Sequence, residues 1–116
     1  VYKGGIISYT NWVKEHLLHV DGRLLEKRGA VSAPVAEAMA RGAREVLRAD
    51  IAVSVTGLAG PGGDDFGNPV GTVFIGYSDR EKTLSREYHF PGDREQVRSR
   101  TTEAALRLVL EEAVRR

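Results

Sequence analysis

The sequence contains no cysteine, which excludes disulfide bonds, zinc–thiolate sites and a cysteine nucleophile. No apolar run approaches the roughly 20 residues that a membrane-spanning helix needs, and no basic-then-apolar leader is visible. The formal net charge is only +1, so no strong field of one sign points to nucleic acid or to an anionic membrane. We therefore expect a soluble, cytoplasmic protein that binds neither nucleic acid nor membrane.

The composition is that of an ordinary globular protein. Hydrophobic residues make up 41% and charged residues 28% of the chain. A length of 116 residues is enough to form one folded core but too short for two domains. We expect a single domain over residues 1–116. The chain starts at Val1 rather than at a methionine and opens directly onto an apolar run, so we expect its natural start to lie upstream.

Strand-like and helix-like segments alternate along the chain without repeats or linkers. Runs of β-branched and apolar residues predict strands at residues 5–9, 51–55, 70–77 and 84–90. Apolar residues at helical spacing predict helices at residues 11–18, 22–28, 33–48 and from 94 to near 113. The predicted fold class is α/β, a mixed sheet flanked by helices.

Local signals add detail to these elements. Asp21, Ser32 and Asp93 are the expected N-caps, and Gly29 is expected to end a helix in the left-handed conformation. The run IAVSV at residues 51–55 is continuously apolar, which predicts a strand covered on both faces. The last two strands are expected to form an antiparallel hairpin. The core-facing stripes of the two long helices are expected to comprise Val35, Ala38, Met39, Gly42, Ala43, Val46 and Leu47, and Val97, Thr101, Ala104, Ala105, Leu108 and Ala113.

The segment TGLAGPGG at residues 56–63 follows the strand at residues 51–55 and holds four glycines among its eight residues. Such a loop can turn its backbone N–H groups toward a phosphate, and ligands of α/β proteins bind beyond the carboxyl ends of strands. It matches neither the Walker loop nor the G-x-G-x-x-G fingerprint. The alternative is a tight turn followed by a hydrophilic tip at residues 64–68, and composition leaves both interpretations open.

Three side chains near expected element ends are further candidates. Tyr9 and Lys14 could serve acid–base chemistry if burial lowers the pKa of the amine; the alternatives are a core ring and a solvated helix lysine. Arg94 lies in the first turn of a helix, where a cation opposes the helix dipole unless it pairs with an anion or with Asp93 or Glu95. Arg94 is therefore a candidate for binding phosphate.

No metal site is expected, since the three histidines have no ligand-like spacing with carboxylates. Three other arginines are expected on the exposed face of the last helix: Arg98, Arg100 and Arg107.

Six motifs, in order, carry a resemblance to a known family. They are GGIISYTN followed by Lys14, LLHV, GAVS at residues 29–32, TGLAGPGG, NPVGTV at residues 68–73 and FPGDR at residues 90–94. Together they resemble the CinA carboxy-terminal domain, whose members include amidases similar to nicotinamide mononucleotide deamidase. The resemblance implies hydrolysis of nicotinamide mononucleotide to nicotinic acid mononucleotide and ammonia, in pyridine nucleotide salvage, with no metal and no cofactor.

The resemblance also implies residue roles. Lys14 would be the general base of a serine/lysine mechanism and Tyr9 would assist it by hydrogen bonding. Thr56, Gly57 and Gly60 would line the nucleotide site in the glycine loop, and Arg94 would engage the phosphate. A minor departure from the family is the pair Trp12 and Val13, where relatives often carry smaller or polar residues, and it would place a bulky ring near the base.

One departure from the family concerns the nucleophile. The family's serine lies in a segment resembling A-E-S-C-T-G-G, ahead of the region matched here, and no part of this chain resembles that segment. We therefore expect a domain without its first strand and helix, which would expose a sheet edge and apolar surface. Two functions remain open, an amidohydrolase when intact and a non-catalytic nucleotide-binding or interaction module. The oligomeric state is open as well, a homo-oligomer included.

Overall fold

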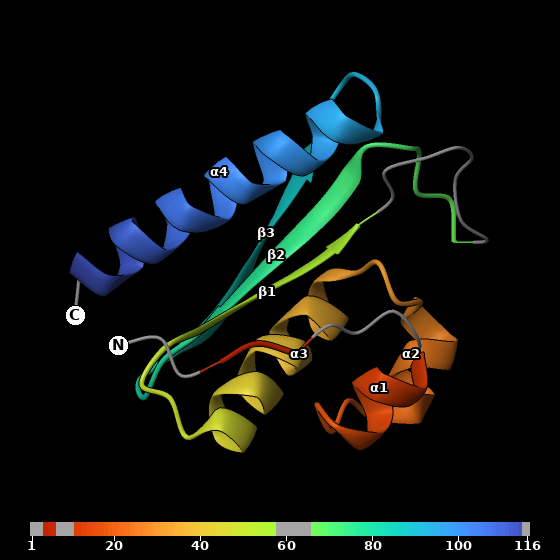
Figure 1. Ribbon diagram of the computed structural model, residues 1–116. Helices are drawn as coiled ribbons and strands as arrows, with labels where there is room; N and C mark the ends of the chain where they lie inside the picture. Colours follow the sequence, from red (N-terminus) through yellow and green to blue (C-terminus); the bar gives the residue numbers. More distant parts are fainter. Residues whose placement is uncertain (1–3, 7–10, 58–65, 115–116) are drawn as a thin grey trace.

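A computed structural model describes residues 4–6, 11–57 and 66–114 (Figure 1). Within these ranges, three helices precede the sheet and one follows it. The elements are α1 (Asn11–His16), α2 (Gly22–Arg28), α3 (Ala33–Leu47), β1 (Ala52–Gly57), β2 (Thr72–Ser78), β3 (Thr83–His89) and α4 (Arg94–Val114). The sheet lies between α3 on one face and α4 on the other, and α1 and α2 pack beside α3. No helix in the described part of the chain is long and apolar enough to cross a bilayer.

The three strands form one antiparallel sheet in the order β1-β2-β3. The predicted hairpin is confirmed, with Thr72 opposite His89 and Ser78 opposite Thr83. Its turn is held by the carboxylate of Asp79, which accepts hydrogen bonds from the backbone N–H groups of Glu81 (2.8 Å) and Lys82 (2.9 Å). The sequence therefore determined this pairing locally, and the predicted arrangement of a sheet flanked by helices is confirmed.

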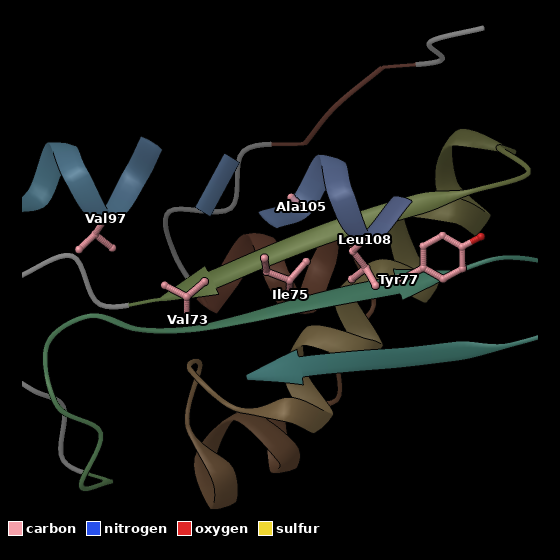
Figure 2. Packing of buried hydrophobic residues seen from close by; sticks show 6 residues of the cluster. All are labelled: Val73, Ile75, Tyr77, Val97, Ala105 and Leu108. Carbon is pink, nitrogen blue, oxygen red and sulfur yellow. The ribbon is translucent and has the colours of Figure 1, made fainter. Parts of the chain in front are cut away.

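The core on the α4 face joins that helix to the central strand. Three side chains of β2 point toward three side chains of α4 (Figure 2). The buried cluster consists of Val73, Ile75, Tyr77, Val97, Ala105 and Leu108. Leu108, Ile75 and Tyr77 are completely buried, so this layer is held mainly by apolar contact. Near the end of α4 the buried residue is Glu112 rather than the predicted Ala113, and its carboxylate pairs with Lys82 at 2.6 Å.

The core on the other face is built around α3. Its cluster consists of Leu18, Val20, Leu25, Val35 and Met39, which come from α2, α3 and the connection before α2. Glycine allows two close approaches there: a Cβ on Gly42 would overlap the carbonyl of Leu18, and one on Gly76 would overlap that of Ala36. The predicted stripe of α3 is wrong at Val46, which is 45% exposed.

Several local predictions need correction. Of the strand predicted at residues 5–9, residues 5 and 6 form no strand, and residues 7–9 lie outside the described residues. Gly29 ends α2 with a positive φ of 79°, but its ψ of 161° is not left-handed helical. Ser32 occupies the N-cap position of α3, yet its hydroxyl donates to the carbonyl of Gly29 at 2.9 Å rather than capping the helix. This hydrogen bond therefore stabilises the turn between α2 and α3.

The strand predicted at residues 51–55 is β1, but it is covered on one face only. Ser54 and Thr56 point to the α3 side and are buried, whereas Val53 and Val55 on the α4 side are 39% and 42% exposed. The prediction that both faces of this strand are covered is wrong, because an apolar run indicates only that its side chains favour burial. Whether a face is covered depends on which helix reaches it.

Candidate functional site

One end of the sheet gathers three of the four predicted site residues that the structure describes. β1 ends at Gly57 opposite Val73, near the start of β2, and the end of β3 at His89 lies opposite Thr72. Arg94 begins α4 shortly after β3, so it lies at the same end (Figure 1). The fold therefore brings Thr56, Gly57 and Arg94 to the same end of the sheet, although they come from two different elements, β1 and α4.

Thr56 and Gly57 are the last two residues of β1 rather than part of the loop that follows. The Thr56 hydroxyl is buried and donates to the carbonyl of Ala30 at 2.7 Å. A Cβ on Gly57 would lie 2.9 Å from a methyl carbon of Val73 and 3.0 Å from the carbonyl oxygen of Thr72, so any larger residue there would force a neighbour to shift. Both residues are therefore held in place by their contacts where β1 ends.

The connection at residues 29–32 also contacts the segment that begins at residue 66. The side-chain amide of Asn68 donates to the carbonyl of Val31 at 3.0 Å. The ring of Phe66 lies where a Cβ on Gly29 would be, so the glycine makes room for it. The chain therefore leaves β1 and returns after the loop beside the same short segment. Sequence reasoning missed this role of Asn68, although the motifs GAVS and NPVGTV contain both halves of the contact.

Lys14 is buried in α1, with 7% of its surface exposed. Burial lowers the pKa of its ammonium below the ordinary value of 10.5, because desolvation disfavours the charged form. Its carbonyl accepts a hydrogen bond from the N–H of Val20 at 2.8 Å, which folds the segment after α1 back onto the helix. The interpretation of Lys14 as a solvated helix lysine is wrong, since Leu18 and Val20 anchor this segment in the core.

The ring of Trp12, two residues before Lys14 on α1, is 60% exposed and stacks on His16 with ring centres 4.5 Å apart. This indole therefore lies on the surface of α1, whereas Lys14 is buried.

Arg94 is the first residue of α4, as predicted, and it is exposed. Asp93 caps this helix: its carboxylate accepts from the N–H of Gln96 (2.9 Å), and the Gln96 side chain accepts from the N–H of Asp93 (2.8 Å). The cap thus fixes the direction in which α4 starts. Lys14 and Arg94 belong to elements on opposite faces of the sheet.

Two predicted site residues, Tyr9 and Gly60, lie outside the described residues, as does the rest of the glycine loop from residue 58 to 65. Within the described ranges, no group of three or more histidine, aspartate or glutamate side chains could hold a metal ion.

Comparison with known proteins places this arrangement in a family. The family model named CinA C-terminal domain matches residues 1–113 of this sequence. The chain belongs to the CinA C-terminal domain family. The resemblance drawn from the six motifs is therefore confirmed, and the sheet end described above is that of a CinA C-terminal domain.

Curated relatives are much longer than this chain. A CinA-like protein of Geotalea daltonii is 50% identical over 112 residues, which cover 97% of this chain and 27% of the relative. A CinA-like protein of Geobacter sulfurreducens is 48% identical over 102 residues, covering 88% of this chain and 25% of the relative. The chain thus spans about a quarter of the length of these curated relatives.

Solved structures share the fold. A competence-damaged protein (CinA) superfamily protein from Enterobacter cloacae aligns with a TM-score of 0.89 at 28% identity, over 93% of this chain and 64% of that one. The competence/damage inducible protein CihA from Agrobacterium tumefaciens aligns with a TM-score of 0.84 at 38% identity, over 90% of this chain and 64% of that one. Both solved chains therefore contain residues that have no counterpart here.

Proposed function

We propose that this CinA C-terminal domain takes part in a metal-independent amide hydrolysis, converting nicotinamide mononucleotide to nicotinic acid mononucleotide and ammonia. The observation that carries the proposal is the burial of Lys14, which lowers the pKa of its amine. A lysine can act as a general base only when it is neutral, and desolvation raises its neutral fraction at a given pH. We place this chemistry in pyridine nucleotide salvage in the cytoplasm.

The proposed reaction needs a nucleophile, a base, donors for the oxyanion and an acid for the leaving amine. Lys14 would remove the proton from the nucleophile and return it to the leaving ammonia, which leaves an acyl intermediate on the serine. A water molecule that gives its proton to neutral Lys14 would then cleave this intermediate, releasing nicotinic acid mononucleotide and restoring the serine. Tyr9 would assist Lys14 by hydrogen bonding. No segment of these 116 residues resembles A-E-S-C-T-G-G, so the serine would be supplied from outside them.

Substrate binding is assigned to the end of the sheet. Arg94 would pair with the phosphate, since an exposed arginine at a helix start is placed to bind an anion. Gly57 and Gly60 would let the loop backbone approach the nucleotide. The Thr56 hydroxyl donates to Ala30 and retains lone pairs with which it can accept a hydrogen bond from the substrate.

Ammonia release from nicotinamide mononucleotide by the full-length protein tests this proposal. Lys14→Met keeps the length of the side chain without its amine, and we expect it to lower the rate by about 10²–10⁴-fold. Lys27→Met, an exposed lysine of α2, is the matched control and should leave the rate unchanged. No substrate-dependent release, or equal rates in the two variants, would overturn the amidase.

The second candidate is a non-catalytic module that binds a nucleotide or a partner, which the lack of a serine motif in this chain favours. Calorimetric titration of the chain with nicotinamide mononucleotide separates a binding module from a plain scaffold. Binding that is lost in Arg94→Ala but kept in Arg100→Ala would support the phosphate role of Arg94. No heat of binding would indicate a scaffold.

A further inference from the structure

His89, at the end of β3, contacts one polar side chain through each of its ring nitrogens. Its Nδ1 lies 3.3 Å from the hydroxyl oxygen of Thr72, the residue opposite it on β2. Its Nε2 lies 2.6 Å from a carboxylate oxygen of Glu87. Among the described residues, Glu87 is the only titratable side chain that interacts with this ring. The charge of the ring is therefore linked to these two contacts.

The positions of the hydrogens in these contacts follow from the hydroxyl of Thr72, which has a single hydrogen to donate. This hydroxyl lies 2.7 Å from the carbonyl oxygen of Pro69, closer than to the ring, so it donates to the carbonyl. The ring must then donate to Thr72 through Nδ1–H, and through Nε2–H to the ionised carboxylate of Glu87, which can only accept. A ring that donates through both nitrogens is an imidazolium. This hydrogen-bond network therefore corresponds to the charged form of His89.

Loss of one ring proton changes the bond that Thr72 makes. The proton released to water comes from Nδ1, because the bond of Nε2–H to the carboxylate of Glu87 is shorter and charge-assisted. The bare Nδ1 is an acceptor, so the hydroxyl of Thr72 would turn from the carbonyl of Pro69 toward the ring. This carbonyl would then keep its bond from the backbone N–H of Thr72 at 3.2 Å and lose the one from the hydroxyl. The turn that ends at Thr72 is therefore held more firmly when the ring is charged.

This turn contacts the elements that carry two of the proposed binding residues. The carbonyl oxygen of Thr72 lies against Gly57, since a Cβ on that glycine would be 3.0 Å from it. The carbonyl of Gly71 accepts a hydrogen bond from the N–H of Phe90 at 2.9 Å, and Phe90 lies four residues before Arg94. The turn thus joins the end of β1 to the segment that leads into α4 (Figure 1). A change in the turn therefore reaches both Gly57 and Arg94.

We propose that His89 is a positioning residue of the proposed nucleotide site, where the charge of its ring decides whether the hydroxyl of Thr72 holds the turn beside Gly57. This inference rests on the proposed function and adds to it a dependence of substrate binding on one histidine. The nucleotide binds more weakly once the ring has lost its proton, because the turn is then less firmly held. The effect of His89 is on binding, whereas that of Lys14 is on the chemical step.

The first test measures the turn in the 116-residue chain without substrate. The NMR shifts of the ring nitrogens give the charge of His89 at each pH, and hydrogen exchange gives the protection of the amides of Thr72 and Phe90. Exchange rates are corrected for their intrinsic change with pH. Both amides should exchange about two- to tenfold faster when the ring is neutral, because the turn has lost one hydrogen bond. The change should follow the titration curve of the ring.

Four variants separate the ring and the hydroxyl from the rest of the fold. His89→Asn has no titrating group and Thr72→Val has no hydroxyl, so in both the exchange rates should no longer change with the charge of residue 89. Thr72→Ser keeps the hydroxyl and should retain the wild-type change. His19→Asn is the matched control, because it replaces another exposed histidine and asparagine tolerates its φ of 60°. It should also behave as the wild type does, and circular dichroism checks that all four variants fold.

The second test measures hydrolysis of nicotinamide mononucleotide by the full-length protein. KM should rise about two- to tenfold as the ring loses its proton, kcat should show no change at that step, and His89→Asn should abolish the rise in KM. A change in exchange that survives in His89→Asn or Thr72→Val would overturn the proposal, as would a KM that does not depend on the charge of the ring. No hydrolysis by the wild type would overturn the proposed function, whereas the exchange rates, measured without substrate, would still decide whether His89 controls the turn.

Discussion

The hydroxyl of Tyr77 donates a hydrogen bond to the carboxylate of Asp79 at 2.8 Å, and both side chains are almost completely buried, with 0% and 2% of their surfaces exposed. The other carboxylate oxygen of Asp79 accepts the two N–H groups of the hairpin turn. This one carboxylate therefore ties the central strand to the turn between β2 and β3.

Asp79→Ala should lower the free energy of unfolding by about 2–4 kcal/mol, because it leaves three donors without their acceptor. Tyr77→Phe removes one donor from the same network and should cost only about 1 kcal/mol. Urea unfolding of both variants measures the difference. If the two variants lost the same free energy of unfolding, the turn would not depend on the carboxylate of Asp79.

Gly76→Ala should destabilise the domain by about 1–3 kcal/mol, since overpacking forces the core to shift. A Cβ at this position would overlap the backbone carbonyl of Ala36 on α3, and backbone cannot move aside as a flexible side chain can. Gly67→Asn is the control: an added Cβ there has nothing within 4 Å, and asparagine tolerates its φ of 85°. Thermal unfolding that ranks the two variants in the opposite order would contradict this packing argument.

Thr56→Val should lower the free energy of unfolding by about 1–2 kcal/mol, because the carbonyl of Ala30 loses its donor in a partly buried position. Thr56→Ser keeps the hydroxyl and should recover most of the loss. If Thr56 also binds the nucleotide, calorimetry should show weaker binding of nicotinamide mononucleotide to the valine variant than to the serine variant. Two variants of equal stability would mean that the bond to Ala30 is not what holds β1 to residues 29–32.

The stability of the domain should depend on pH through Lys14. Its pKa in the folded chain lies below its ordinary value of 10.5, so the unfolded chain binds more protons between the two values. The contribution of Lys14 therefore makes folding more favourable as pH rises through that window. Below the folded pKa the penalty of burying the charge is present in full.

Lys14→Met removes that titration. The stability of this variant relative to the wild type should be greatest below the folded pKa of Lys14 and should decline as pH approaches 10.5. Urea unfolding over a pH series gives the change with pH in the free-energy difference between this variant and the wild type. Lys27→Met, which replaces an exposed lysine, is the control and should differ from the wild type by the same amount at each pH. A difference between Lys14→Met and the wild type that stays constant with pH would contradict the burial of a titrating amine.

Much of the fold could be predicted because its signals are local. Asp21 and Asp93 cap their helices as expected, since a capping bond joins residues only two or three positions apart. The hairpin of β2 and β3 likewise follows from two apolar runs and a short charged turn. At the candidate site, Arg94 was correctly placed in the first turn of a helix by the same local reasoning.

The sequence by itself determined the family, through its six motifs, and the helices and strands whose signals lie within a few residues. Only the tertiary structure decided that Lys14 is buried, that Thr56 bonds Ala30, and that one face of β1 stays open. Each of these features depends on contacts between segments that are far apart in the chain. The spacing of residues along one segment does not indicate which other segment will cover it. Val55 is as apolar as a core residue, yet it remains exposed because α4 packs on the neighbouring strand.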